Sequence, residues 1–490
     1  MARRASTAES QSRHEQTLGR ARLVVLALLS MAAPSCGGDD AATEAERPAG
    51  SGTGGSAGQG GTGGSAGAAA GGGNAGSGTG GGTAVGAADF VPLHPYRALD
   101  TRGSAMPSSG APACVTLAGT GPIPADAKAV LVNIAAVTPT GAGHFVAYPE
   151  GSAEPSTSTV NYASANVANG AIVDLGASGA ICVVPKQGQA HAIVDVSGYF
   201  TANSSYRAIT PSRVVDTRTG AIQSAGDAHC VNVAGVGDVA ADAAAVIVNI
   251  AAVNAPSAGH LRVHPDGSPA TDTSTLNFAA GQTIANGAVV PVGTDGRVCV
   301  TMAPTSTHYV LDVTGFLAAS TKLQPLTPTR RLDTRKTGRL EAGSITCLTL
   351  ADSDLPANAR GALLNLTAIQ PSAAGFAVVY PEGHIKPTTS TINFAAGAVV
   401  ANNAIVQPGD GGRVCIHTSA ATDLVLDVSG FFASTSSDLP CASVSCGTPP
   451  PPVCSGGTEL ITHAATGVCK LGTCIYEESA KACTCSGNAC

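Results

Sequence analysis

Through most of the chain, apolar residues come in runs of four to nine, separated by clusters of Gly, Pro, Asn and Asp. Such runs predict short strands joined by turns, and no stretch keeps the period of an amphipathic helix. In the clearest stretch we expect strands at Ile345–Leu350, Leu363–Ile369, Phe376–Tyr380, Thr391–Ala395, Ala404–Gln407, Arg413–Thr418 and Leu424–Phe432. The pattern is typical of antiparallel sandwiches or barrels and predicts an all-β protein.

The same pattern is written three times. "AVLVNIAAV" from Ala129 returns as "AVIVNIAAV" from Ala245 and "ALLNLTAI" from Ala362, and each copy opens on an Asp-Thr-Arg triplet. The copies cover residues 89–203, 204–319 and 320–436, about 115 residues each. Solenoid repeats are only about 20–50 residues long. We therefore expect three complete β-domains in tandem, either sandwiches or barrel-like.

Each copy holds two cysteines, separated by 68, 69 and 68 residues. A bridge between an early strand and the penultimate one would stabilise each domain by about 4 kcal/mol in the loop-entropy model. Zinc is the alternative, but neither a CxxC motif nor a recurring histidine accompanies these cysteines. We therefore predict the disulfides Cys114–Cys182, Cys230–Cys299 and Cys347–Cys415.

Residues 437–490 differ in composition and contain eight cysteines. This density predicts a small module held by four disulfides of unknown pairing. The cysteines are Cys441, Cys446, Cys454, Cys469, Cys474, Cys483, Cys485 and Cys490.

Residues 1–35 read as an export signal, because a basic start precedes the apolar stretch "LVVLALLSMAA", which is too short to span a bilayer. The stretch ends in "APSC", which resembles a bacterial lipobox closing at Cys36, although Ala33 stands where such boxes usually have Leu. Ordinary signal peptidase could cut at the same bond. The chain has 15 cysteines, so setting Cys36 aside leaves an even number that can pair. We expect lipidation at Cys36, with two acyl chains anchoring the protein to a membrane.

From residue 36 to residue 88 the chain is dominated by Gly, Ser, Ala and Thr, which cannot build a core and predict a flexible tether. The formal net charge is −7, and no Lys/Arg block occurs in the body of the chain. Nucleic-acid binding needs a basic surface, so we expect no nucleic-acid partner.

The copies resemble a repeat of secreted and cell-wall proteins of actinobacteria and myxobacteria, which begins with P-x-R-x-x-DTR and ends with VDVxGYF. Here the starts are "HPYRALDTR", "TPSRVVDTR" and "TPTRRLDTR", and the ends are "VDVSGYF", "LDVTGFL" and "LDVSGFF". The tail wording "TPPPPVCSGGTEL" is similar to small modules that end myxobacterial surface proteins. These resemblances imply architecture and an envelope location, and bring no assigned activity.

Few ionisable residues recur in all three copies, and no Ser/His pair or free Cys recurs that could form a nucleophilic site. An Asp interrupts the last apolar strand of each copy, where an unpaired charge would be unfavourable. We expect the arginine of the DTR triplet to pair with it and latch the last strand to the first. A carboxylate pair for glycoside hydrolysis is the alternative. The clamp residues are Asp100, Arg102, Asp195, Asp216, Arg218, Asp312, Asp333, Arg335 and Asp427.

Asparagines also recur within apolar runs, as Asn133, Asn249 and Asn365. They can satisfy backbone groups at bulges and strand ends, or they can form a polar glycan-binding patch with Tyr148 and Tyr380. The chain has no Trp for sugar stacking, and the second copy has His264 at the tyrosine position. No DxDxDG-like cluster indicates calcium, and we expect neither a metal nor a cofactor.

These observations predict an exported, lipid-anchored cell-envelope protein, most simply of the outer membrane, without catalytic activity. We expect it to bind an envelope or extracellular polymer, such as polysaccharide or peptidoglycan, or another surface protein, and so to mediate adhesion. Three weak sites on one chain would gain avidity. A purely structural spacer is the first alternative, and a hydrolase is the second.

Overall fold

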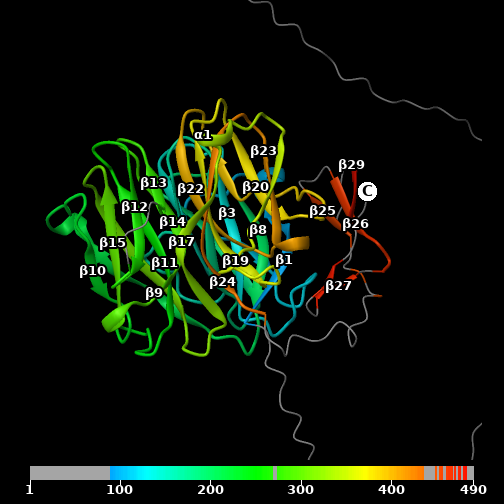
Figure 1. Ribbon diagram of the computed structural model, residues 1–490, viewed down its shortest axis with the longest axis horizontal. Coiled ribbons are helices and arrows are strands. Elements are labelled where there is room, and N and C mark those ends of the chain that lie inside the picture. Colours follow the sequence, from blue (N-terminus) through cyan, green and yellow to red (C-terminus); the bar gives the residue numbers. More distant parts are fainter. Residues whose placement is uncertain are drawn as a thin grey trace, which may run out of the picture. The chain divides into compact units, whose positions relative to one another are not determined.

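The computed structural model describes residues 89–268, 273–434 and short stretches between 447 and 482. The predicted signal peptide, Cys36 and the tether lie outside the described residues, as do five of the eight tail cysteines. Thr79–Cys490 form one compact unit. The described residues are nearly all β, in antiparallel sheets (Figure 1).

Each repeat contains eight strands. The first has β1 (Phe90–Asp100), β2 (Ala113–Thr116), β3 (Ala129–Val137), β4 (Gly143–Pro149), β5 (Val160–Tyr162), β6 (Val167–Asp174), β7 (Ala180–Lys186) and β8 (His191–Phe200). The second has β9 (Tyr206–Asp216), β10 (His229–Asn232), β11 (Ala245–Val253), β12 (Gly259–Pro265), β13 (Leu276–Phe278), β14 (Ile284–Pro291), β15 (Arg297–Ala303) and β16 (His308–Leu317). The third has β17 (Leu323–Asp333), β18 (Ile345–Thr349), β19 (Gly361–Ile369), β20 (Gly375–Pro381), β21 (Ile392–Phe394), β22 (Val399–Val406), β23 (Arg413–Thr418) and β24 (Asp423–Phe432).

Short elements complete the described chain. Single helical turns follow the first strand of each repeat, as η1 (Thr101–Gly103), η2 (Thr217–Thr219) and α1 (Thr334–Thr337). Two more precede β15 and β23, as η3 (Thr294–Gly296) and η4 (Asp410–Gly412). The tail contributes β25 (Val453–Ser455), β26 (Glu459–His463), β27 (Val468–Lys470), β28 (Thr473–Ile475) and β29 (Glu478–Ala482).

Every repeat divides its strands between two four-stranded sheets. In the first repeat one sheet has the order β1-β8-β3-β6 and the other β2-β7-β4-β5, and the other two repeats reproduce both orders. We call the sheet with the first and last strands the inner sheet and the other the outer sheet. The two sheets of the first repeat share one core, to which Val132 on β3, Phe145 on β4 and Val183 on β7 contribute.

The central strands of the inner sheets are buried on both faces. Along β3, Val130 and Val132 pack into the core of their own repeat, whereas the intervening Ala129 and Leu131 pack with residues of the other two repeats. Side chains alternate between the two faces of a strand, so burial on both sides requires a continuous apolar run. This explains why "AVLVNIAAV" is apolar throughout.

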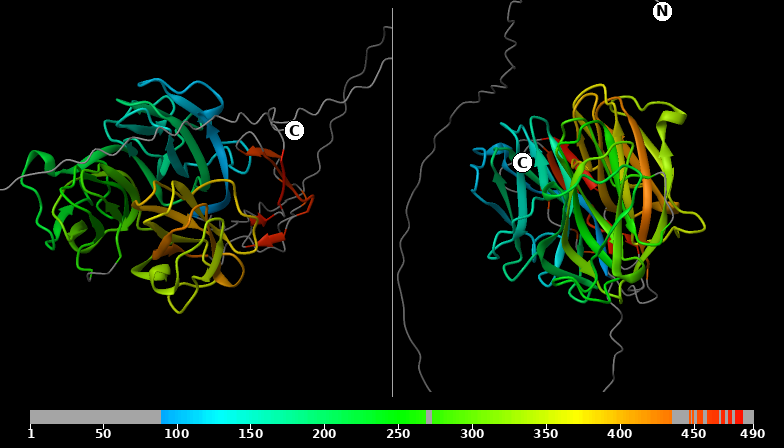
Figure 2. Two further views of the ribbon diagram at one scale, coloured as in Figure 1. Left: turned by 90° about the horizontal axis from the view of Figure 1, so that it is seen from above. Right: turned by 90° about the vertical axis from the view of Figure 1, so that its left-hand side faces the viewer.

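The three repeats meet around a shared apolar centre, formed by residues of the inner sheets (Figure 2). The aromatic rings of Phe90, Phe200 and Phe432 lie there in mutual contact, with centroids 5.2 to 5.9 Å apart. The expected three β-sandwich or barrel-like domains in tandem do not describe this arrangement, because apolar side chains continue from one repeat into the next.

Six four-stranded sheets around one centre can be compared with the blades of a six-bladed propeller. These sheets are not built from strands that follow one another in the chain. Within each repeat, the inner sheet has the strand order 1-8-3-6 and the outer sheet the order 2-7-4-5. The all-β, antiparallel architecture with small sheets is as predicted.

The seven strands expected in the third repeat overlap β18 to β24. The strand that precedes them, β17, is not among the seven, and Pro325 and Pro328 interrupt its pattern. It pairs only with β24 at one edge of its sheet, where proline is tolerated.

Candidate functional site

A buried ion pair joins the first strand of each repeat to the last. Arg97 on β1 donates from Nε to Oδ1 of Asp195 on β8 (2.9 Å) and from Nη2 to Oδ2 (3.4 Å). The corresponding Nε–Oδ1 distances are 2.8 Å for Arg213–Asp312 and 2.9 Å for Arg330–Asp427. Asp195 is only 2% exposed, and a carboxylate so buried needs a charged, two-pronged partner.

The arginine in this pair is not the one expected from the sequence. The arginines of the DTR triplets, Arg102, Arg218 and Arg335, instead bind the aspartate of their own triplet, with Nη2–Oδ2 distances of 2.6, 2.6 and 2.7 Å. That pairing is local because a helical turn follows the first strand. The turn brings the arginine back to the aspartate two residues before it. The DTR arginine therefore stabilises a turn, whereas the arginine at the start of the phrase latches the strands.

The two classes of aspartate differ in their pKa. The hydrogen bond from Arg218 lowers the pKa of Asp216 to about 2, and the pKa values of Asp100 and Asp333 are also lowered by their arginine partners, against the effect of burial. Burial raises the pKa of each clamp aspartate against the effect of its arginine, in Asp195, Asp312 and Asp427. These aspartates thus hold the fold together in pairs with arginine.

The clamp aspartate lies in a polar row across the inner sheet. In register, Arg97 on β1 is opposite Asp195 on β8, and Asp195 is opposite Asn133 on β3, which is opposite Gly170 on β6. The second and third repeats contain the same row, centred on Asn249 and Asn365. Asn133 alternates with Val132 and so faces away from the core of its own repeat.

The recurring asparagines form a ring of hydrogen bonds between repeats. Nδ2 of Asn169 in the first repeat donates to Oδ1 of Asn249 in the second (2.9 Å). Asn286 of the second donates likewise to Asn365 of the third (3.4 Å), and Asn402 of the third returns to Asn133 of the first (2.9 Å). These asparagines are 0 to 7% exposed, apart from the half-buried Asn133. Their partners in neighbouring repeats explain why polar side chains recur in apolar runs.

A second set of bonds runs around the same ring. Nδ2 of Asn249 donates to the carbonyl of Ser158 in the preceding repeat (2.7 Å), and the backbone N–H of Gly287 donates to Oδ1 of Asn169 (2.7 Å). The other two boundaries repeat both contacts. The position of Gly287 has no room for a Cβ beside the carbonyl of Gly170, so glycine permits this close approach.

Asp89 ties together the starts of the three repeats. Its carboxylate accepts hydrogen bonds from the N–H and hydroxyl of Ser205 (2.7 Å for the hydroxyl), from the hydroxyl of Thr321 (2.9 Å) and from the N–H of Lys322 (2.9 Å). Asp89 directly precedes β1, and its donors directly precede β9 and β17. Sequence reasoning missed this residue because Ser205 and Lys322 stand at its equivalent positions.

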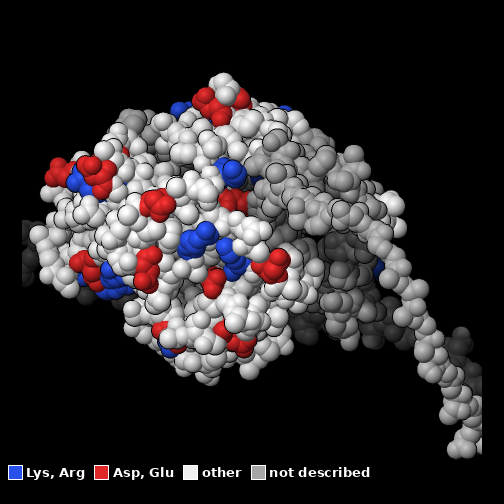
Figure 3. All heavy atoms as spheres, turned by 90° about the horizontal axis from the view of Figure 1, so that it is seen from below, with Lys and Arg blue, Asp and Glu red and all other residues white. Residues whose placement is uncertain are grey.

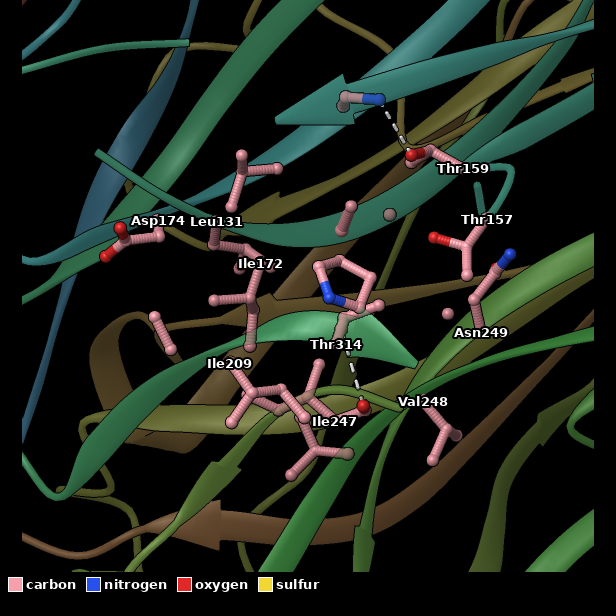
Figure 4. Close-up of a pocket in the computed structure, with 18 of the residues that line it drawn as sticks. Leu131, Thr157, Thr159, Ile172, Asp174, Ile209, Ile247, Val248, Asn249 and Thr314 are labelled. Carbon is pink, nitrogen blue, oxygen red and sulfur yellow. Dashed lines mark hydrogen bonds between the residues drawn. The ribbon is translucent and has the colours of Figure 1, made fainter. Parts of the chain in front are cut away.

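A cavity of about 520 Å³ opens between the first and second repeats. Tyr148 and Thr157 of the first repeat line it, together with Ile209 and Asn249 of the second, and its inner end reaches Leu363 of the third repeat. Figure 4 shows aliphatic side chains in the middle of this space, with Asp174 on one side and Thr157 and Asn249 on the other. The volume is within the range of about 300–1,000 Å³ typical of small-molecule sites.

A related cavity of about 450 Å³ lies between the second and third repeats. His264 and Thr327 line it at the positions that Tyr148 and Thr210 occupy in the first cavity. Arg262 and Asp427 add charged groups to the lining of the second cavity. At the boundary between the third repeat and the first, His384 and His94 stand at the positions equivalent to Ser152 and Thr210. These two rings stack with centroids 5.8 Å apart.

The predicted ligand patch is only partly brought together. Tyr148 and Asn249 line the same cavity, and Asn365 lines the second. Tyr380 is buried with Val378 and Cys415, and Asn133 bonds to Ser390 and Asn402 at the third boundary. The asparagine amides are engaged between repeats, whereas Tyr148 lines the first cavity.

The three predicted disulfides within the repeats are confirmed: Cys114–Cys182, Cys230–Cys299 and Cys347–Cys415. Each joins directly opposed residues of the outer sheet, for example on β2 and β7. A turn acid lies beside each bridge, as Glu150, Asp266 and Glu382, and among the described residues these are the groupings compact enough for a metal. Bridged sulfurs are not thiolates, so each grouping keeps one carboxylate as a possible metal ligand. In the tail, Cys454, Cys469 and Cys474 lie in described strands whose side chains are not described.

Charges on the face shown in Figure 3 lie in small mixed groups, with Lys or Arg next to Asp or Glu. The pairs Arg331–Asp352 and Arg297–Asp266 are examples on the described surface. No helix in the described part of the chain is long and apolar enough to cross a membrane.

Comparisons with known proteins do not assign the chain to a family. No protein-family model matches it, and no curated protein sequence matches it. Among solved structures it is similar to a chain described under "The Triple Jelly Roll Fold and Turret Assembly in an Archaeal Virus", with 10% identity over 70% of this chain and 91% of that one. The TM-score of 0.17 is too low to support an argument from this similarity.

Proposed function

We propose that this protein is a non-catalytic, lipid-anchored protein of the cell envelope that binds an envelope or extracellular polymer and so mediates surface adhesion. The observation that carries the proposal is the cavity between the first two repeats, with Tyr148 at its lining and residues of all three repeats around it. A tyrosine beside threonine hydroxyls offers a stacking face and hydrogen bonds to a neutral chain.

The ring of asparagines changes how such binding would work. Three loosely linked domains would bind through three similar sites and gain avidity from their number. Here hydrogen bonds between repeats join them, and the two described cavities differ in their lining. We therefore propose one binding body on a tether, whose affinity depends on the intact ring.

A sedimentation assay tests this proposal. The full, disulfide-intact chain is mixed with purified peptidoglycan, exopolysaccharide or whole cells, and the fraction retained in the pellet is measured. Tyr148→Ala should reduce retention on one polymer by at least about tenfold, the effect of losing one stacking contact, whereas Tyr148→Phe should keep it. Equal retention of both variants, or no retention on any polymer, would contradict polymer binding through this cavity.

A structural spacer is the second candidate, and the hydrogen-bonded ring favours it because it makes the three repeats a stiff body. This function predicts no retention on polymers, together with altered spacing of envelope layers when the protein is absent. Hydrolysis is less well supported, because the recurring carboxylates are paired with arginines. Polymer cleavage that is lost on changing a single Asp would favour the hydrolase.

For the fold of each repeat we infer a jelly roll. The support comes from eight strands in two four-stranded antiparallel sheets, with the order 1-8-3-6 facing 2-7-4-5 across a shared core. Three such units, joined by their inner sheets, account for six sheets around one centre.

A further inference from the structure

The cavity between the first two repeats has two chemically different ends. Its inner end is aliphatic, with two branched side chains contributed by each repeat. They are Leu131, Ile172, Ile247, Val289, Leu363 and Ile405. Figure 4 shows Ile172, Ile209 and Ile247 in the middle of this space, with Leu131 beside them. Thr314 and Asn403 also line the cavity, but their side chains donate to the carbonyls of Ile247 and Gly287. The aliphatic surface that is left favours an apolar occupant over water.

The charged residues of the lining are all acidic. They are Asp174, at the end of β6, and the exposed Asp238, and Figure 4 shows Asp174 on the opposite side of the aliphatic residues from Thr157. Among the described residues that line the cavity there is no Lys, Arg or His. Lys128 lies outside the lining but near enough to lower the pKa of Asp174, which burial raises. An anionic group would meet like charge here.

We infer that this cavity binds a small amphiphile with one aliphatic chain and an uncharged or cationic head. The chain would lie against the inner aliphatic side chains, and the head would face Asp174. At about 30 Å³ for a water-sized group, 520 Å³ corresponds to at most about 17 such groups, which suits a chain of roughly ten carbons.

The second cavity does not offer the same chemistry. Its lining includes Arg262 and His264, and lacks the inner residues Leu131, Ile172 and Leu363. We therefore expect one amphiphile per chain. The inference concerns the inner end of the same cavity and does not depend on polymer binding at its rim.

A displacement assay on the full chain tests the inference. Cys36→Ser removes the predicted acylation site, so no acyl chain of the protein itself competes. The neutral fluorescent probe N-phenyl-1-naphthylamine is bound first, and decylammonium, decanol and decanoate are then added below their micelle concentrations. Decylammonium and decanol should displace the probe with a stoichiometry of one per chain, and decanoate should be at least about tenfold weaker because of its charge.

Three variants locate the site. Ile172→Trp enlarges a side chain that lies in the middle of the cavity and should weaken decanol binding by at least about tenfold. Ala225→Trp adds the same ring on an exposed loop and should leave binding unchanged. Asp174→Asn should strengthen decanoate binding and so narrow its difference from decanol. This variant decides the question of charge even if Ile172→Trp does not fold.

Several results would overturn the inference. These are no saturable binding of any of the three compounds, decanoate binding as tightly as decanol, or unchanged binding by a folded Ile172→Trp chain. Failure here is distinguishable from failure of the proposed function. A chain that binds decylammonium and no polymer keeps the inference and loses polymer adhesion, whereas the opposite result keeps adhesion alone.

Discussion

Asn402 of the third repeat donates a hydrogen bond to Asn133 of the first, at 2.9 Å, and this contact joins the last repeat to the first. Together with Asn169–Asn249 and Asn286–Asn365 it makes the order of repeats cyclic, although the chain itself is linear. The third repeat therefore has contacts at two boundaries, as each of the others does.

Replacing Asn402 by Ala should destabilise the whole body. Asn402 also donates to the carbonyl of Thr391 (2.6 Å) and accepts from the N–H of Gly170 (2.8 Å). With each orphaned buried group costing roughly 1–3 kcal/mol, we expect a loss of about 2–4 kcal/mol in the free energy of unfolding. Denaturant titration measures it. Asn393→Ala is the control, because Asn393 accepts only a local bond from Ser390 and should cost less than about 1 kcal/mol. Equal effects of both changes would contradict a closing role for Asn402.

The two arginines of the third repeat should differ in their effect on stability. Arg330→Ala leaves Asp427, which is 3% exposed, without its bidentate partner. Removing one partner of a buried pair costs roughly 3–5 kcal/mol, and the partial exposure of Arg330 lowers our expectation to about 2–4 kcal/mol. Arg335→Ala removes a side chain that is 48% exposed, and Asp333 keeps Arg330 within 3.7 Å, so the change should cost less than about 1 kcal/mol. Thermal melts of the two variants would show the reverse order if the DTR arginine were the clamp.

The sequence was sufficient to predict most strands of the third repeat and the disulfide within each repeat. Runs such as "IVDVSGYF" and the constant spacing of cysteine pairs depend on local geometry and on one repeat alone, so three copies give three observations of the same signal. The fact that the first strand joins the last also follows from a charged residue in each, Arg97 and Asp195, although the identity of the arginine does not. Arg102 is equally close in sequence, and only the turn at Thr101–Gly103 decides between them.

The arrangement of the repeats could not be predicted in the same way. The partner of Asn402 is 269 residues away in the sequence. A recurring Asn gives the same sequence pattern whether its partner lies in its own copy or in the next. One signal was available: β3 is apolar at consecutive positions, and an antiparallel strand with one solvated face would alternate. The cavity between repeats could not be predicted either, because its residues come from different copies.

Asp89→Asn should loosen the starts of the second and third repeats. The carboxylate of Asp89 has two acceptor oxygens, whereas the amide of Asn has one. The NH₂ group of the Asn would therefore face hydrogen-bond donors of Ser205, or of Thr321 and Lys322, which it cannot accept from. We expect a loss of about 1–3 kcal/mol and faster amide hydrogen exchange at residues 201–205 and 318–322. Asp126→Asn, at an exposed position, is the control. Unchanged exchange in the two linkers would show that Asp89 does not hold them.

His94 should make the stability of the protein sensitive to mild acid. Burial first, and then the nearby His384 and His463, lower the pKa of His94 from 6.5 to about 3. Between these values the unfolded chain binds a proton that the folded chain does not. Stability must therefore fall as the pH drops from about 6.5 towards 3, by at most about 1.4 kcal/mol per pH unit from this group.

Replacing His94 by Thr, the residue at the equivalent positions Thr210 and Thr327, should remove this contribution. Melting temperatures measured from pH 7 to pH 4 for both chains would then diverge, with the variant losing less stability. Carboxylates titrate in both chains, so the difference between the two curves isolates the histidine. His384→Ser should have a smaller effect of the same sign, because it removes one neighbouring charge and leaves the burial of His94 in place. Parallel curves for wild type and His94→Thr would mean that His94 is not held neutral by its surroundings.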